Sequence, residues 1–166
     1  KAINLYNEKK LISPYGSVVK QIAEIWVKKG SSCQKKENYD DAINCYDKAL
    51  ESEPKYDVAL MNKGNTLRIM KKYSDAIKCL DDAIKINPKD YYPHHRKTLA
   101  NINWEKYSDA IELAENLLER FPEESEQTTI LLIQIYEETG ETSKQKEYEK
   151  KLQEIRDLKN NKTDGV

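Results

Sequence analysis

The chain has 166 residues, 34% of them charged, and a mean hydropathy of -0.88, which leaves little apolar material for one thick globular core. The 28 Lys and Arg nearly balance the 29 Asp and Glu, so a net charge of -1 excludes a bulk attraction to nucleic acid or to an anionic membrane. No apolar run is long enough to insert into a bilayer.

Residues 1–22 begin with a segment that recurs later in the chain. Four of its residues stand 40 positions before the same residue type: Ala2, Ile3, Tyr6 and Pro14 match Ala42, Ile43, Tyr46 and Pro54. The later copy is predicted to be the second helix of a hairpin, so residues 1–22 are expected to hold a half-repeat followed by an insertion. Ser17 is the expected N-cap of a first helix that the insertion prolongs by about 9 Å. Because Lys1 already lies in a helical pattern, we expect a fragment of a longer protein.

Three units with a period of 34 residues follow, at 23–56, 57–90 and 91–124. A tyrosine, an alanine, an isoleucine and a proline recur in register without gaps. These columns are Tyr39, Tyr73 and Tyr107; Ala42, Ala76 and Ala110; Ile43, Ile77 and Ile111; and Pro54, Pro88 and Pro122. A fixed period of this length indicates a stack of repeated supersecondary units.

Each unit is predicted to consist of two helices joined by a short turn. In its second half, apolar residues recur at helical spacing, as Ala42 and Tyr46 do, which indicates one buried stripe. We expect these second helices to begin after the tyrosine, with Asp40, Ser74 or Ser108 as the N-cap, and to end before the proline.

Residues 125–159 are predicted to form a degenerate fourth unit. They keep the order of helix, Gly-containing turn and helix, but they lose the tyrosine and alanine columns. The last helix has a narrow apolar seam at Tyr148, Leu152 and Ile155 and is otherwise charged, as a terminal cap facing solvent requires. Residues 160–166 are expected to be a flexible tail.

The repeated pattern resembles the tetratricopeptide repeat. The matching features are the 34-residue period, Trp26 or Leu60 near the start, Gly30 and Gly64 at the eighth place, and the later tyrosine, alanine and proline columns. The resemblance implies an all-α fold, a right-handed α-α superhelix (solenoid) of stacked antiparallel helix hairpins. Small residues at the eighth place let the paired helices approach closely. The third unit departs from the family pattern, because Thr98 replaces the glycine, so looser packing is expected there.

Charge is predicted to separate between two helix layers. The resemblance implies that the first helices line a concave surface and the second helices a convex one. The first-helix stretches of the three full units hold eleven Lys and Arg against three Asp and Glu. The second-helix stretches hold four against twelve.

The family pattern also implies which places face the groove. The main expected peptide-binding residues are Lys28, Lys35, Met61, Asn62, Asn65, Arg68, Tyr92, His95 and Arg96. The remaining lining places hold Glu24, Val27, Ser31, Gln34, Val58, Ile69, Leu99, Ile102 and Asn103. Four cations outnumber one acid, and Met61 and Tyr92 supply adaptable apolar contacts, which suits an acidic peptide with one or two hydrophobic anchors. The alternative is a merely solvated charged face.

Some members of the family bind the C-terminal carboxylate of chaperones through five cationic or amide side chains. Asn62 and Arg96 match two of these places. Val27, Ser31 and Tyr92 occupy the other three and cannot supply the required donors. The pattern therefore favours an acidic segment over that specific carboxylate clamp.

Catalytic and metal motifs are missing from the sequence. His94 and His95 are adjacent, so on a helix they point about 100° apart, and His94 falls in a core column. No H-E-x-x-H, C-x-x-C or Gly-rich phosphate loop occurs. We expect neither a cofactor nor a metal, and no enzymatic activity.

The predicted function is a protein-protein interaction scaffold that binds an acidic or C-terminal segment of a partner in a basic concave groove. Two alternatives are self-association through an exposed repeat edge and service as the interaction arm of a larger enzyme. Binding to RNA is opposed by the near-zero net charge and the acidic convex helices. The three cysteines, Cys33, Cys45 and Cys79, are odd in number and lack a C-x-x-C pair, which indicates reduced thiols and a cytoplasmic location.

Overall fold

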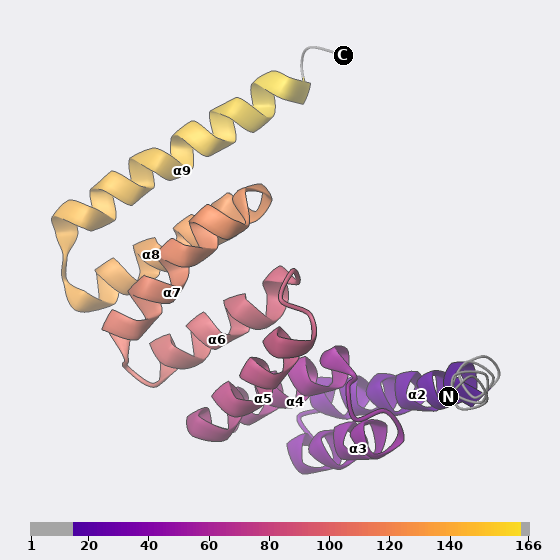
Figure 1. Ribbon diagram of the computed structural model, residues 1–166. Helices are drawn as coiled ribbons and strands as arrows, with labels where there is room; N and C mark the ends of the chain where they lie inside the picture. Colours follow the sequence, from indigo (N-terminus) through magenta and orange to yellow (C-terminus); the bar gives the residue numbers. More distant parts are fainter. Residues whose placement is uncertain (1–14, 164–166) are drawn as a thin grey trace, which may run out of the picture. The chain divides into compact units, whose positions relative to one another are not determined.

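The computed structural model describes residues 15–163, and every regular element within that range is a helix. The helices are α2 (Tyr15–Lys35), α3 (Tyr39–Ser52), α4 (Asp57–Ile69), α5 (Tyr73–Ile86), α6 (Tyr91–Asn103), α7 (Tyr107–Arg120), the short 3-10 helix η1 (Pro122–Glu124), α8 (Ser125–Thr139) and α9 (Thr142–Thr163) (Figure 1). The all-α prediction is confirmed. The predicted half-repeat over residues 1–14 lies outside the described residues.

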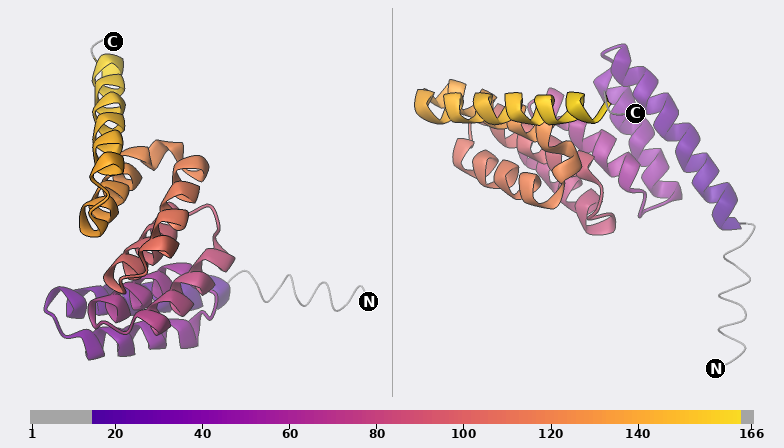
Figure 2. Two further views of the ribbon diagram at one scale, coloured as in Figure 1. Left: turned by 90° about the vertical axis from the view of Figure 1, so that its left-hand side faces the viewer. Right: turned by 90° about the horizontal axis from the view of Figure 1, so that it is seen from above.

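The chain divides after Pro88 into two compact units, the first holding α2 to α5 and the second α6 to α9. In the first unit α2 pairs with α3 and α4 with α5, while α3 and α2 both contact α4. In the second unit α6 pairs with α7 and α8 with α9, while α7 and α6 both contact α8. Figure 2 shows these hairpins from two further sides. Stacked helix hairpins, as the sequence predicts, therefore build each unit. None of the described helices is both long and apolar enough to span a membrane.

Small side chains bring the paired helices of the first unit together. Ala42, Ala49 and Ala59 are fully buried in a core that also contains Tyr46. A Cβ atom added at Gly30 would lie 2.6 Å from Cε1 of Tyr46, a separation that real Cβ atoms essentially never show. Because glycine has no side chain, Gly30 leaves room for the Tyr46 ring of the facing helix.

The same close approach recurs one repeat later. A Cβ atom at Gly64 would lie 2.8 Å from Cγ of Leu80 and 3.1 Å from the carbonyl oxygen of Ala76. In the second unit Thr98 takes this place, is buried, and donates through Oγ1 to the carbonyl oxygen of His94 at 3.2 Å. The threonine hydroxyl is therefore satisfied by its own helix.

The starts of the second helices differ from the prediction. Helices α3, α5 and α7 begin at the tyrosines themselves, so Asp40, Ser74 and Ser108 lie in the first turn and are not N-caps. The residues at the N-cap places make no side-chain hydrogen bond to the backbone.

The backbone of the preceding turn explains these starts. Glu37, Lys71 and Glu105 adopt left-handed conformations with φ of 62°, 61° and 61°. This conformation lets the amide three residues beyond the end of the first helix bond back to it, as in Lys72 N to Leu67 O at 2.9 Å. The turn is therefore set by the end of the first helix, and a side-chain cap is not required.

Helix α2 is longer than its counterparts, as predicted, but its start is different. It has 21 residues against 13 in α4 and α6. Because it begins at Tyr15, Ser17 lies inside the helix and does not cap it.

The last hairpin ends the described part of the chain with a charged helix. Gly140 closes α8 with a φ of 75°, and Tyr148 of α9 is buried and stacks on Tyr136 with ring centroids 5.5 Å apart. Glu126 of α8 accepts hydrogen bonds from Arg156 at 2.9 Å and from Lys159 at 2.8 Å. Helix α9 continues to Thr163, so residues 160–163, predicted to be flexible, are helical.

Candidate peptide-binding faces

In the first unit, the predicted binding residues lie on the neighbouring first helices α2 and α4. Lys28 and Lys35 are exposed on α2, and Met61, Asn62 and Arg68 are half-buried on α4. Both helices contact each other directly, so their side chains can share one face. We call the surface formed by Lys28, Lys35, Met61, Asn62 and Arg68 the α2–α4 face.

A hydrogen-bond network holds α2 and α4 in place. The Gln34 carbonyl oxygen Oε1 accepts from the Tyr46 hydroxyl at 3.1 Å and from Thr66 Oγ1 at 3.0 Å. Burial raises the pKa of the Tyr46 hydroxyl, so it remains a protonated donor at neutral pH. Gln34 stands at a predicted groove place, and its carbonyl oxygen joins α2 to both α3 and α4.

Asn65 is buried and does not line the surface that the sequence predicts for it. Its Oδ1 accepts from Arg68 Nε at 3.3 Å and from Arg68 Nη2 at 3.1 Å. These two bonds fix the direction of the guanidinium group. Asn65 therefore acts on the face by orienting Arg68.

Two further lining predictions are wrong. Val27 is buried in the core of the first unit, and Ile102 is buried beside Ala110 and Leu131 in the second. Both occupy places that the family pattern assigns to the groove. In this chain their apolar side chains pack between helices, where burial is more favourable than exposure.

In the second unit, the predicted residues lie on α6. Tyr92 is 57% exposed, and its ring packs edge-on against Tyr91 with centroids 5.8 Å apart. His95 is half-buried, with Nδ1 2.9 Å from the Tyr91 hydroxyl, which also lies 3.1 Å from Thr128 Oγ1 of α8. Burial raises the pKa of Tyr91, so this hydroxyl stays protonated at neutral pH. Arg96 is half-buried on the same helix.

Ile130 extends the apolar part of this region and was not predicted. It is exposed on α8, which contacts α6. It stands at the sixth place of the fourth unit, a groove-facing place that the prediction applied only to the three full units. Extending the register by one unit would have found it. Tyr92, His95, Arg96 and Ile130 are called the α6–α8 face below.

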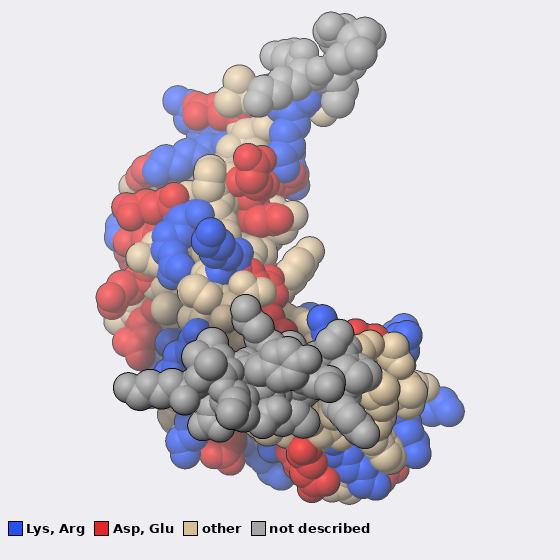
Figure 3. Space-filling model, turned by 45° about the vertical axis from the view of Figure 1, so that its right-hand side comes forward, with Lys and Arg blue, Asp and Glu red and all other residues tan. Residues whose placement is uncertain are grey.

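Several lysines of the first unit interact with other side chains of the same unit. Lys63 forms an ion pair with Asp47 of α3. Lys29 and Lys48 place their Nζ atoms 5.1 Å and 4.5 Å from the centre of the Trp26 ring. On the face that Figure 3 presents, blue and red side chains are intermixed. The positive charge of a binding face therefore depends on particular side chains.

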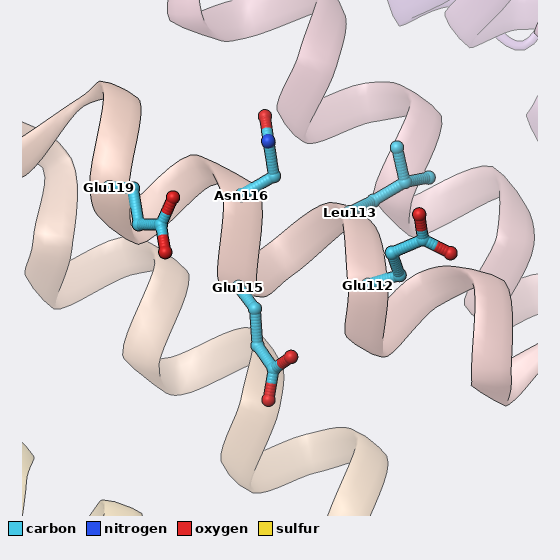
Figure 4. Close-up of a pocket in the computed structure, with 5 residues that line it drawn as sticks. All are labelled: Glu112, Leu113, Glu115, Asn116 and Glu119. Carbon is cyan, nitrogen blue, oxygen red and sulfur yellow. The ribbon is translucent and has the colours of Figure 1, made fainter.

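The second helices carry the opposite charge. Glu112, Glu115 and Glu119 of α7, with Leu113 and Asn116, line a shallow depression of about 360 Å³ (Figure 4). Figure 4 shows that their carboxylates do not converge on one point. Within residues covered by the structure, no group of three or more His, Cys, Asp or Glu is arranged to hold a metal ion.

The thiols and the paired histidines have structural surroundings. Burial raises the pKa of the Cys45 thiol, assisted by the neighbouring Cys33, and burial also raises that of Cys79. Both remain thiols at neutral pH, which makes them weak nucleophiles. His94 is buried with its ring centre 5.4 Å from that of Phe121, as its core column predicts.

Comparison with protein families and solved structures identifies the repeat. The family model described as tetratricopeptide repeat matches residues 23–56 and 58–90. The first TPR of Spaghetti (RPAP3), bound to the HSP90 peptide SRMEEVD, shares 26% identity over 73% of this chain and 95% of that chain, with a TM-score of 0.66. MamA 41-end from Desulfovibrio magneticus RS-1 shares 19% over 93% of each chain, with a TM-score of 0.72. The TPR2B domain of yeast Sti1, in a pHsp70 complex, shares 19% over 71% of this chain and 98% of that chain, with a TM-score of 0.66. No curated protein matches the chain.

Proposed function

We propose that this chain is a scaffold that binds a segment of a partner protein, because residues 23–56 and 58–90 are tetratricopeptide repeats. Two of the similar solved structures are complexes, one with an HSP90 peptide and one with pHsp70. These ligands belong to those proteins, and they support a peptide or protein as the class of ligand here. The residues of the α2–α4 face support a more specific proposal.

The proposed ligand of the α2–α4 face is an acidic segment, and the observation that carries this is the Asn65–Arg68 pair. Asn65 holds the guanidinium of Arg68 in one direction before any ligand arrives. A preorganised forked donor recognises a carboxylate with little further loss of side-chain freedom. Exposed Lys28 and Lys35 add positive charge on the adjacent helix. The SRMEEVD peptide of the similar structure is itself acidic, with two Glu and one Asp.

The proposed role of the α6–α8 face is to receive an apolar side chain of the partner. Tyr92 of α6 and Ile130 of α8 are 57% and 44% exposed on two helices that contact each other, so together they give this face an accessible apolar area. Tyrosine supplies a rigid contact area at low entropic cost. Arg96, on the same helix as Tyr92, can pair with an acidic neighbour of that side chain.

A binding measurement with a defined probe tests the charge selection. The probe is a fluorescein-labelled SRMEEVD peptide, with SRMKKVK as its charge-reversed control, followed by fluorescence anisotropy. The acidic peptide should bind more tightly than the control, and its affinity should fall as salt is raised from 50 to about 200 mM, because exposed charge pairs are screened. Equal binding of both peptides contradicts the acidic-segment proposal.

Matched charge reversals locate the binding face. Reversing Lys35 and Arg68 together to Glu should weaken the acidic peptide by about tenfold or more. The control reverses Lys78 and Lys85, two exposed lysines of α5 whose ion pairs lie on its surface, and should change affinity by less than about twofold. A larger effect of the α5 pair would move the interface to the second helices.

A further inference from the structure

Gln34 of α2 has a side-chain amide whose direction is fixed by two neighbouring helices. Its carbonyl oxygen Oε1 accepts from the Tyr46 hydroxyl of α3 at 3.1 Å and from Thr66 Oγ1 of α4 at 3.0 Å. Both donors therefore hold the oxygen toward the inside of the first unit. Because the amide group is planar, its NH2 group points the other way.

The Tyr46 hydroxyl requires this orientation of the amide. Tyr46 is fully buried, and burial raises its pKa, so the hydroxyl keeps its proton at neutral pH. A buried donor that lacks an acceptor is costly. Ser31 Oγ lies 3.5 Å from the hydroxyl, at the limit of a hydrogen bond, whereas Gln34 Oε1 lies at 3.1 Å. An amide turned by 180° would leave the Tyr46 proton with only the weaker acceptor.

The NH2 group of Gln34 lies beside the α2–α4 face. Within the described residues, its nitrogen Nε2 has no hydrogen-bond partner and is not fully buried. Thr66 Oγ1, which contacts the same amide, also lies 2.9 Å from the carbonyl oxygen of Asn62. Asn62 belongs to the α2–α4 face, so the amide is located where α2 meets that turn of α4.

We propose that Gln34 is a further binding residue of the α2–α4 face and that its NH2 group donates a hydrogen bond to a carboxylate of the bound segment. This role rests on the acidic-segment function proposed above. A glutamine side chain offers both a donor and an acceptor, but here Tyr46 and Thr66 occupy the acceptor. The residue therefore presents only N–H donors to a ligand, which favours a carboxylate and disfavours the ammonium group of a lysine. Because the amide is already oriented, the bond forms with little further loss of side-chain freedom.

Two Gln→Glu substitutions on the same helix test the proposal. Gln34→Glu keeps an oxygen that accepts from Tyr46 and Thr66, but it replaces the outward donor by a negatively charged acceptor. At pH 8 its affinity for the fluorescein-labelled SRMEEVD peptide should fall by about tenfold or more, and its affinity for SRMKKVK should rise. The control is Gln21→Glu, because Gln21 is exposed on α2 and undergoes the same change of charge. It should change the affinity for SRMEEVD by less than about twofold.

The two peptides separate the failure of this role from the failure of the proposed function. If the wild type binds both peptides equally, the acidic-segment function is wrong, and the role of Gln34 is wrong with it. If the wild type prefers SRMEEVD and Gln34→Glu binds that peptide as tightly as Gln21→Glu does, only the role of Gln34 is refuted.

Exchange of the side-chain NH2 protons with water, measured by NMR on the wild type, decides the matter should Gln34→Glu fail to fold. In the free chain the NH2 protons of Gln34 should exchange within about threefold of the rate for exposed Gln21. Bound SRMEEVD should slow the exchange at Gln34 by about threefold or more and leave Gln21 unchanged. Exchange about tenfold slower at Gln34 than at Gln21 in the free chain would show that the NH2 group is turned inward, which overturns the proposal. Exchange at Gln34 that does not change when the peptide binds overturns it as well.

Discussion

Gly30 is the residue at which a single added methyl group has the clearest consequence. In an exposed helix, Gly→Ala stabilises by about 0.5–1 kcal/mol. Here the new Cβ would meet the Tyr46 ring, whose hydroxyl is also bonded to Gln34. We expect Gly30→Ala to lower the free energy of unfolding by about 1–3 kcal/mol, measured by chemical denaturation.

Ser32→Ala provides the matched control for that substitution. Ser32 is exposed on the same helix two residues away, so its replacement should change the free energy of unfolding by less than about 0.5 kcal/mol. A stabilising effect of Gly30→Ala would mean that α2 and α3 do not approach as closely as the structure shows.

Lys71 is a residue whose backbone is strained. Its φ of 61° lies in the left-handed region, which side chains other than glycine adopt at a cost. Lys71→Gly should raise the free energy of unfolding by about 0.5 kcal/mol, because relief of this strain exceeds the added entropy of the unfolded chain. Lys72→Gly, at a φ of -86°, should instead lower it by a similar amount. Chemical denaturation measures the change in the free energy of unfolding for both variants. A change of the same sign in the two variants would contradict the turn geometry.

At the scale of elements, the α8–α9 hairpin depends on the charge of Glu126. Hydrogen bonds from Lys159 and Arg156 lower the pKa of this carboxyl below its usual 4.5. A lowered folded-state pKa contributes stability above the unfolded pKa, and that contribution is lost as the pH falls through the folded value. The attachment of α9 should therefore weaken below about pH 4.5.

Glu126→Gln removes this dependence and tests it. The variant should have a lower Tm than the wild type at pH 7, and the difference between the two should shrink toward pH 3, where the wild-type carboxyl is protonated. Glu137→Gln, also on α8, should leave the Tm at pH 7 and the Tm at pH 3 within about 1 °C of the wild-type values. A difference between Glu126→Gln and wild type that persists at pH 3 would mean that the side chain acts by packing and not by charge.

How far the sequence determines these elements can be judged from individual helices. The period of 34 and the apolar stripes predict the second helices α3, α5 and α7 well, because their buried faces are regular. Their N-caps were misplaced by two residues, since Glu37 and its counterparts close the turns through the backbone. The start of α2 at Tyr15 was also missed, because Ser17, a residue type that favours the N-cap place, lies two residues inside the helix.

The candidate faces were predicted less completely than the helices. A column in the repeat specifies the average direction of a side chain, which is sufficient for exposed Lys28 and Tyr92. It does not specify local hydrogen bonds, such as those that turn buried Asn65 toward Arg68. The repeat column also fails to predict the position of an apolar side chain such as Val27, for which burial in the core is more favourable than exposure.

At the scale of the whole molecule, the two compact units each contain one of the two tryptophans. Trp26 lies in the first unit, with the Nζ atoms of Lys29 and Lys48 near its ring. Trp104 lies in the second unit, with the Nζ of Lys106 3.7 Å from the centre of its ring. Trp26→Phe would leave Trp104 as the one tryptophan, in the second unit, and Trp104→Phe would leave Trp26 as the one tryptophan, in the first unit. In a repeat array each repeat is stabilised mainly by contacts with its neighbours. Gly30→Ala should therefore lower the midpoint of unfolding reported by Trp26 fluorescence more than the midpoint reported by Trp104 fluorescence. The chain thus carries an intrinsic optical label in each half, and the order in which the halves melt can be recorded without attaching a dye.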